Sequence, residues 1–146
     1  MRKLRTPLVA VMILATPAIL AAQGFRIYPG STKYIPPNTE QSRKMQEAMA
    51  PGTVTTHYLT SDSFERVVAF YKTFARQYDM PGIPKGRKLP SGQDLKQTYF
   101  IFDGASDLST SKSWAQVQRP FVGSMDENLQ PQDVRDITVI NASQKK

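Results

Sequence analysis

The chain of 146 residues contains no cysteine. This absence excludes disulfide bonds, thiolate ligands for zinc or iron–sulfur clusters, and cysteine nucleophiles. It also excludes the acylated cysteine that anchors bacterial lipoproteins. A small domain without disulfides must be stabilised by its own hydrophobic core or by a partner.

Histidine and tryptophan each occur once, as His57 and Trp114. A Ser–His–Asp catalytic system would have to use His57, which we interpret instead as a half-exposed residue of a strand. A single histidine without cysteine also disfavours a transition-metal site. We therefore predict no catalytic residue, no metal site and no cofactor.

Long hydrophobic runs are scarce as well. One apolar run covers 16 residues, 7–22, and Pro17 interrupts it. A membrane-spanning helix needs roughly 20 apolar residues, so we expect no permanent membrane anchor. Basic residues precede the run and small residues end it, which is typical of a secretory signal peptide. We predict a signal peptide over residues 1–22, cleavage at 22–24, and a periplasmic or extracellular location that excludes cytosolic cofactors such as ATP.

The positive charge is modest once the signal peptide is set aside. The formal charge is +7, and removing the three basic residues near the start leaves 16 basic against 12 acidic residues. Nucleic-acid-binding domains carry denser, one-sided basic clusters, so we expect no nucleic-acid partner. Lys85, Arg87 and Lys88 lie in a loop rich in Pro and Gly. They are the best candidates for binding an anionic ligand, with a solvated loop as the alternative.

The first part of the mature chain precedes the predicted domain, and we call it the lead-in. We assign residues 23–52 to an extended segment with a short helix, and 53–146 to a single domain. Thr39 can cap a helix over residues 40–49, which Pro51 and Gly52 end. This helix has few apolar residues, so we expect it to lie across a surface.

Residues 62–65 have the spacing of a capping box and begin the strongest helical pattern. The predicted helix extends to about Tyr78. Its apolar residues recur at helical spacing and form one stripe: Phe64, Val67, Val68, Tyr71, Phe74, Ala75 and Tyr78. We expect this helix to be the centre of the core.

Four strands are predicted, over residues 53–60, 97–103, 113–119 and 135–141. The order β-α-β-β-β and the short connections favour an antiparallel sheet. The predicted fold class is therefore α+β, with one long amphipathic helix on one face of a small sheet and a short N-terminal helix. Apolar side chains occur at both parities of 99–102, so we expect the second face to be covered by the short helix or by another protein.

Trp114 and Tyr99 are the aromatic candidates for that second face. If Ala115 and Val117 face the long helix, Trp114 faces away from it. Trp and Tyr are enriched at protein interfaces, so we expect a protein partner or self-association through this sheet face. Ordinary packing beneath the N-terminal segment is the alternative.

Few carboxylates occur in patterns that could bind a metal ion or catalyse a reaction. Asp103 and Asp107 flank a turn that contains Gly104, where they could hold calcium, but the EF-hand spacing is absent. Glu65 with either aspartate is the only candidate pair of carboxylates for a glycoside hydrolase. We interpret the aspartates as turn-forming residues and Glu65 as part of the helix cap.

Three segments carry a resemblance: YPG at 28–30, YLTSDSFERVVAFYK at 58–72 and FIFDGA at 100–105. Together they resemble an uncharacterised family of exported bacterial domains. The resemblance covers most of the mature chain and implies a fold, but it transfers no catalytic residue. The sequence predicts an exported, non-catalytic binding or assembly module of the cell envelope or extracellular space. The alternative is a small secreted hydrolase or carbohydrate-active enzyme.

Overall fold

The computed structural model describes residues 24–146, so the predicted signal peptide over residues 1–22 lies outside the described residues. Within residues 24–146 there are two helices, α1 (Glu40–Met49) and α2 (Phe64–Lys72). The strands follow in chain order: β1 Thr32–Tyr34, β2 Thr53–Thr60, β3 Arg76–Tyr78, β4 Arg87–Lys88, β5 Asp94–Ile101, β6 Ser113–Arg119, β7 Phe121–Met125, β8 Pro131–Arg135 and β9 Thr138–Lys145.

The fold is mainly β, so the predicted α+β class is wrong. One antiparallel sheet has the strand order β1-β2-β9-β6-β5-β3, with β4 added at β5, and β7 pairs with β8 in a separate hairpin. The prediction missed the short strands β1, β3 and β4 and the hairpin. These segments are short and mostly polar, and only pairing with a neighbouring strand makes them extended.

The predicted long helix is also wrong, because α2 ends at Lys72 and residues 76–78 form β3. β3 pairs with the outer edge of β5, where Tyr78 lies opposite Tyr99. This pairing gives the backbone of β3 partners that a longer helix would have found internally. The helical spacing of Tyr78 therefore did not decide its conformation.

The N-terminus of α2 begins one residue later than the capping-box prediction. Ser63 is the N-cap, and its hydroxyl accepts from the backbone N–H of Arg66. Asp62 instead accepts a hydrogen bond of 2.6 Å from the hydroxyl of Tyr28. Glu65 forms an ion pair with Lys96 of β5. The side chains of this predicted box thus tie α2 to the lead-in and to the sheet.

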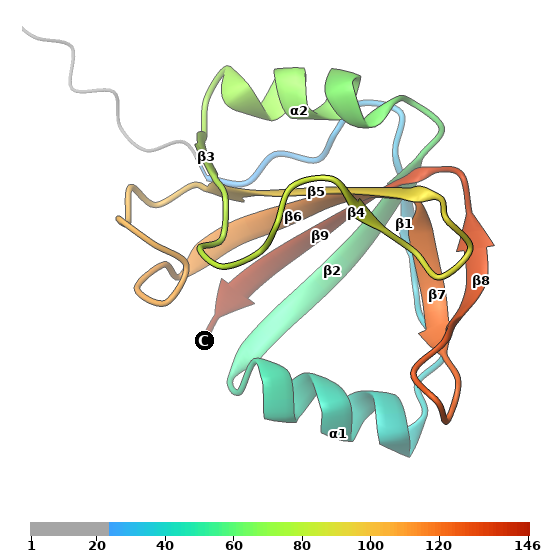
Figure 1. The fold of residues 1–146 in the computed structure, drawn as a ribbon. Coiled ribbons are helices and arrows are strands. Elements are labelled where there is room, and N and C mark those ends of the chain that lie inside the picture. The colour runs from blue at the N-terminus through green and yellow to red at the C-terminus, as the bar shows by residue number, and fades with distance from the viewer. Residues whose placement is uncertain (1–23) are drawn as a thin grey trace, which may run out of the picture.

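The hydrophobic core lies between α2 and one face of the sheet (Figure 1). Its buried members are Tyr28, Val67, Val68, Tyr71, Phe100, Phe102, Ala115, Val117 and Ile140. The start of the lead-in passes through this layer, because Phe25 contacts the rings of Tyr58, Tyr71 and Phe102. The opposite side of the sheet has a smaller buried patch near one end, where Phe121 of β7 packs against Tyr34 with ring centroids 5.1 Å apart.

The helix α1 has the bounds predicted from the sequence, with a capping box between Thr39 and Ser42. It lies on the side of the sheet opposite α2 (Figure 1). None of its residues is buried, and Met49 is 79% exposed. The expectation that this helix packs across a surface is wrong, and the sheet face away from α2 is left open along its centre.

Candidate functional site

The open face of the sheet carries a row of directly paired side chains across six strands. Antiparallel pairing places opposite residues on the same face, and each member of the row is opposite the next. From one edge to the other the row is Tyr78, Tyr99, Gln116, Asn141, His57 and Tyr34. All six are half-buried. We call these six residues the polar row.

Hydrogen bonds connect the centre of the polar row. The amide of Asn141 donates to Oε1 of Gln116 at 2.8 Å. The amide of Gln116 in turn lies 3.4 Å from the hydroxyl of Tyr99, which also accepts from Gln97 at 2.9 Å. Nδ1 of His57 lies 2.7 Å from Oδ1 of Asn141. Four neighbouring strands are thus linked through their side chains.

These bonds determine the tautomer of His57. Because the Asn141 amide donates to Gln116, its Oδ1 is an acceptor, and Nδ1 of His57 must carry the hydrogen. Nε2 of the neutral ring is then an acceptor without a hydrogen-bond partner among residues 24–146. The row also retains donors: the hydroxyl hydrogen of Tyr99 and one amide hydrogen each on Gln116 and Asn141.

A second row adjoins the polar row and contains Trp114. In this row Trp114 lies opposite Ser143, which lies opposite Thr55. The hydroxyls of Thr55 and Ser143 are 2.9 Å apart. The ammonium of Lys145 lies 5.9 Å from the centre of the Trp114 ring. Trp114 and Tyr99 therefore share a face. The residue opposite Trp114 on β5 is the buried Ile101, and the residue opposite Tyr99 on β6 is the polar Gln116.

The basic residues predicted to lie in a loop are found at the β5 edge of the sheet, where Arg87 and Lys88 form β4. Lys85 and Arg87 line a cavity of about 390 Å³ beside β5, and Tyr99 lines it as well. Lys85 pairs with Asp79, and Lys88 pairs with Asp94 in β4 and β5. The structure thus groups three of the five predicted binding residues around one cavity, while Lys88 and Trp114 lie outside its lining.

Asp103 and Asp107, which were considered as metal ligands or catalytic groups, accept hydrogen bonds that stabilise the loop between β5 and β6. Burial raises the pKa of Asp103, but hydrogen bonds from the backbone N–H of Lys112 and the hydroxyl of Ser111 bring it below its ordinary value. The hydroxyl of Ser109 lowers the pKa of Asp107. Within the part of the chain that the structure describes, no group of three His, Asp or Glu side chains could hold a metal ion.

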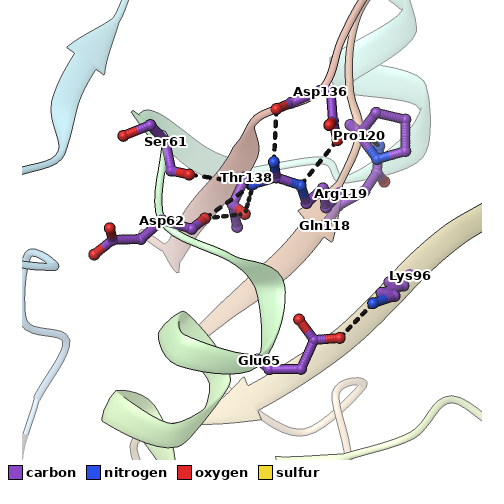
Figure 2. A network of polar contacts seen from close by, with 9 residues as sticks. All are labelled: Ser61, Asp62, Glu65, Lys96, Gln118, Arg119, Pro120, Asp136 and Thr138. Carbon is purple, nitrogen blue, oxygen red and sulfur yellow. Dashed lines mark hydrogen bonds and ion pairs between the residues drawn. The ribbon is translucent and has the colours of Figure 1, made fainter.

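Arg119 is the centre of a second polar network, shown in Figure 2. Its Nε donates to the Asp136 carboxylate at 3.0 Å, and Nη2 donates to the Asp136 carbonyl at 2.7 Å. Nη1 donates to the Asp62 carbonyl at 3.0 Å and lies 3.2 Å from the Thr138 hydroxyl. These contacts join the ends of β6 and β9 to the start of α2. Because the protein itself occupies the donors of Arg119, we interpret the network as structural.

Comparison with known proteins finds no matching family model, curated protein or solved structure. The resemblance to an exported bacterial family therefore stays a prediction. Among residues 24–146 no helix combines the length and apolar character needed to cross a bilayer.

Sequence reasoning missed Gln97, Gln116 and Asn141, which supply most of the hydrogen bonds on the open face. The alternation of β6, with Ala115 and Val117 buried between polar residues, could have placed Gln116 on the open face. No sequence pattern could have placed Gln116 beside Asn141, because the pairing of β6 with β9 brings together positions 25 residues apart.

Proposed function

We propose that this protein is an exported, non-catalytic binding module and that the open face of its sheet binds an extended neutral glycan. The polar row carries the proposal. Its central members, Tyr99, Gln116, Asn141 and His57, are uncharged and offer both donors and an acceptor. The centre of a typical protein–protein interface is instead apolar.

The geometry of the row favours a chain that crosses the strands. Neighbouring strands are about 4.8 Å apart, close to the length of one pyranose in an extended chain. The four central positions span about 14 Å at that spacing, which matches three to four sugars. Tyr78 stands at one end of the row, where an aromatic ring can pack against the C–H face of a sugar. At the other end, the ring of Tyr34 packs against Phe121 and limits the row.

The chemistry of the face favours binding over hydrolysis. Glycoside hydrolysis commonly uses two carboxylates that flank the scissile bond. None of the residues paired along the open face of residues 24–146 is acidic. Glu65 lies on the α2 side, where Lys96 holds it and lowers its pKa.

Titration with cellohexaose and chitohexaose tests the proposal. Trp114 is the single tryptophan and lies one row from Gln116, so its fluorescence reports ligand on this face. We expect a hexasaccharide to bind more tightly than its disaccharide. Gln116→Leu should weaken binding about tenfold, equivalent to roughly 1.4 kcal/mol. Gln132→Leu, at an exposed position of β8, is the matched control.

Two outcomes contradict the glycan proposal. One is the failure of the folded protein to bind either hexasaccharide at millimolar concentration. The other is a concentration-dependent dimer in sedimentation that Gln116→Leu dissociates, because that result assigns the open face to a protein interface.

A further inference from the structure

The cavity beside β5 has features of a binding site for a small amphipathic molecule. It has a volume of about 390 Å³, within the usual range of ligand pockets. Its walls come from the start of α2, the segment from β3 to β4, and residues 94–99 of β5. Five lining residues are apolar: Phe64, Met80, Ile83, Pro84 and Leu95.

The cavity exists because the edge of β5 is paired at two separate places. β3 pairs with β5 as far as Tyr99, and β4 pairs with it at Leu95 and Asp94. Between these places the connecting segment moves away from the edge and returns. The hydroxyl of Thr98 accepts from Gln77 and donates to Asp79, each at 3.0 Å, and so fixes the inner end of this segment.

The charges around the cavity are balanced except at Arg87. Lys85 pairs with Asp79, and Lys96 pairs with Glu65. Arg87 has no carboxylate partner among the described residues, and its guanidinium makes a weak hydrogen bond of 3.4 Å to Gln97. A guanidinium binds a carboxylate with two parallel hydrogen bonds. Arg87 is thus the cation available to an incoming anion.

We propose that this cavity binds a carboxylate with an apolar chain or ring, with the apolar part against Ile83 and Leu95 and the carboxylate at Arg87. This site is separate from the glycan surface in its chemistry, although Tyr99 lines the cavity and also belongs to the polar row. Among the described residues that line the cavity, an apolar wall and the single unpaired cation of Arg87 match a monoanion.

Calorimetric titration of the purified protein with monomeric decanoate, and with decanol at equal chain length, tests this proposal. We expect decanoate to bind at least about tenfold more tightly than decanol. Arg87→Gln should remove that preference without changing decanol binding, whereas Ile83→Asn should weaken both ligands. Lys85→Gln is the matched control for charge, because Asp79 already pairs with Lys85.

The proposal is overturned if decanoate fails to bind the folded protein, or if Arg87→Gln and Lys85→Gln weaken it equally. Binding to phosphatidylglycerol vesicles without binding to monomeric decanoate would assign the basic segment to a membrane surface instead. Asn141→Leu, which alters only the polar row, should leave decanoate binding unchanged. Failure of this site and failure of the glycan surface are therefore distinguishable.

Discussion

Nδ1 of His57 lies 2.7 Å from Oδ1 of Asn141, and this contact joins β2 to β9 through their side chains. The orientation of the Asn141 amide, set by Gln116, makes the histidine nitrogen the donor. A residue that the sequence presents as an isolated histidine is therefore held in one tautomer by its neighbours.

Asn141→Leu should release that tautomer. We expect nitrogen-15 chemical shifts of His57 to move from the Nδ1–H form toward a mixture of tautomers. Loss of these hydrogen bonds should also lower the free energy of unfolding by about 1 kcal/mol. Gln41→Leu on the exposed helix α1 is the control for both measurements. Unchanged His57 shifts would show that Asn141 does not set the tautomer.

Two valines on the α2 side of the sheet should respond differently to truncation. Val117 is fully buried, whereas Val54 is 46% exposed. Val117→Ala should cost roughly 1.5–3 kcal/mol, since it removes two methyl groups and leaves a cavity. Val54→Ala should cost less than about 0.5 kcal/mol. Urea melts of both variants provide the comparison, and equal costs would contradict the described core.

Arg119 should not tolerate replacement by lysine. Its guanidinium contacts Asp136 and the carbonyl of Asp62 at the same time, and its side chain is 22% exposed. Lysine cannot reproduce this planar set of donors, so Arg119→Lys should lower the free energy of unfolding by about 1–2 kcal/mol. Arg66→Lys, at a side chain 73% exposed, should change it by less than about 0.5 kcal/mol. Thermal unfolding measures both variants. Equal changes in the melting temperature of Arg119→Lys and Arg66→Lys would show that the network contributes nothing to stability.

Stability should decrease in alkali because of Tyr71. Burial raises the pKa of Tyr71 above the ordinary value of 10.0. The stabilising effect of the neutral phenol is fully present below pH 10, and it is lost as the pH rises from 10 toward the folded-state pKa, because the unfolded chain ionises first. Tyr71→Phe should flatten this decrease when urea melts are measured between pH 8 and pH 11. An equally steep decrease in Tyr71→Phe would assign it to other groups.

The mature protein should begin between Ala22 and Phe25 and be found outside the cytoplasm. The basic start and the apolar run that follows it predict this processing. N-terminal sequencing of protein from the native host checks the cleavage site. Recovery of an intact Met1 in the cytoplasmic fraction would contradict it.

The sequence by itself determined the local features whose causes lie within a few residues. The cap at Thr39, the bounds of α1 and the turn at Gly52, with φ of 67°, follow from side-chain capping and glycine geometry. The apolar stripe that includes Val67 and Tyr71 correctly marked the helix over the core. The absence of cysteine likewise fixed the absence of disulfides.

Only the tertiary structure decided what depends on pairing between distant segments. Residues 76–78 follow a helical pattern, yet the free edge of β5 makes them a strand. Gln116, Asn141 and His57 become neighbours through strand register, which no local propensity encodes. The cavity at Arg87 arises in the same way, from two separate pairings along one edge. Local sequence therefore set α1 with its cap and the buried stripe of α2, whereas long-range strand pairing set the end of α2 and both proposed binding surfaces.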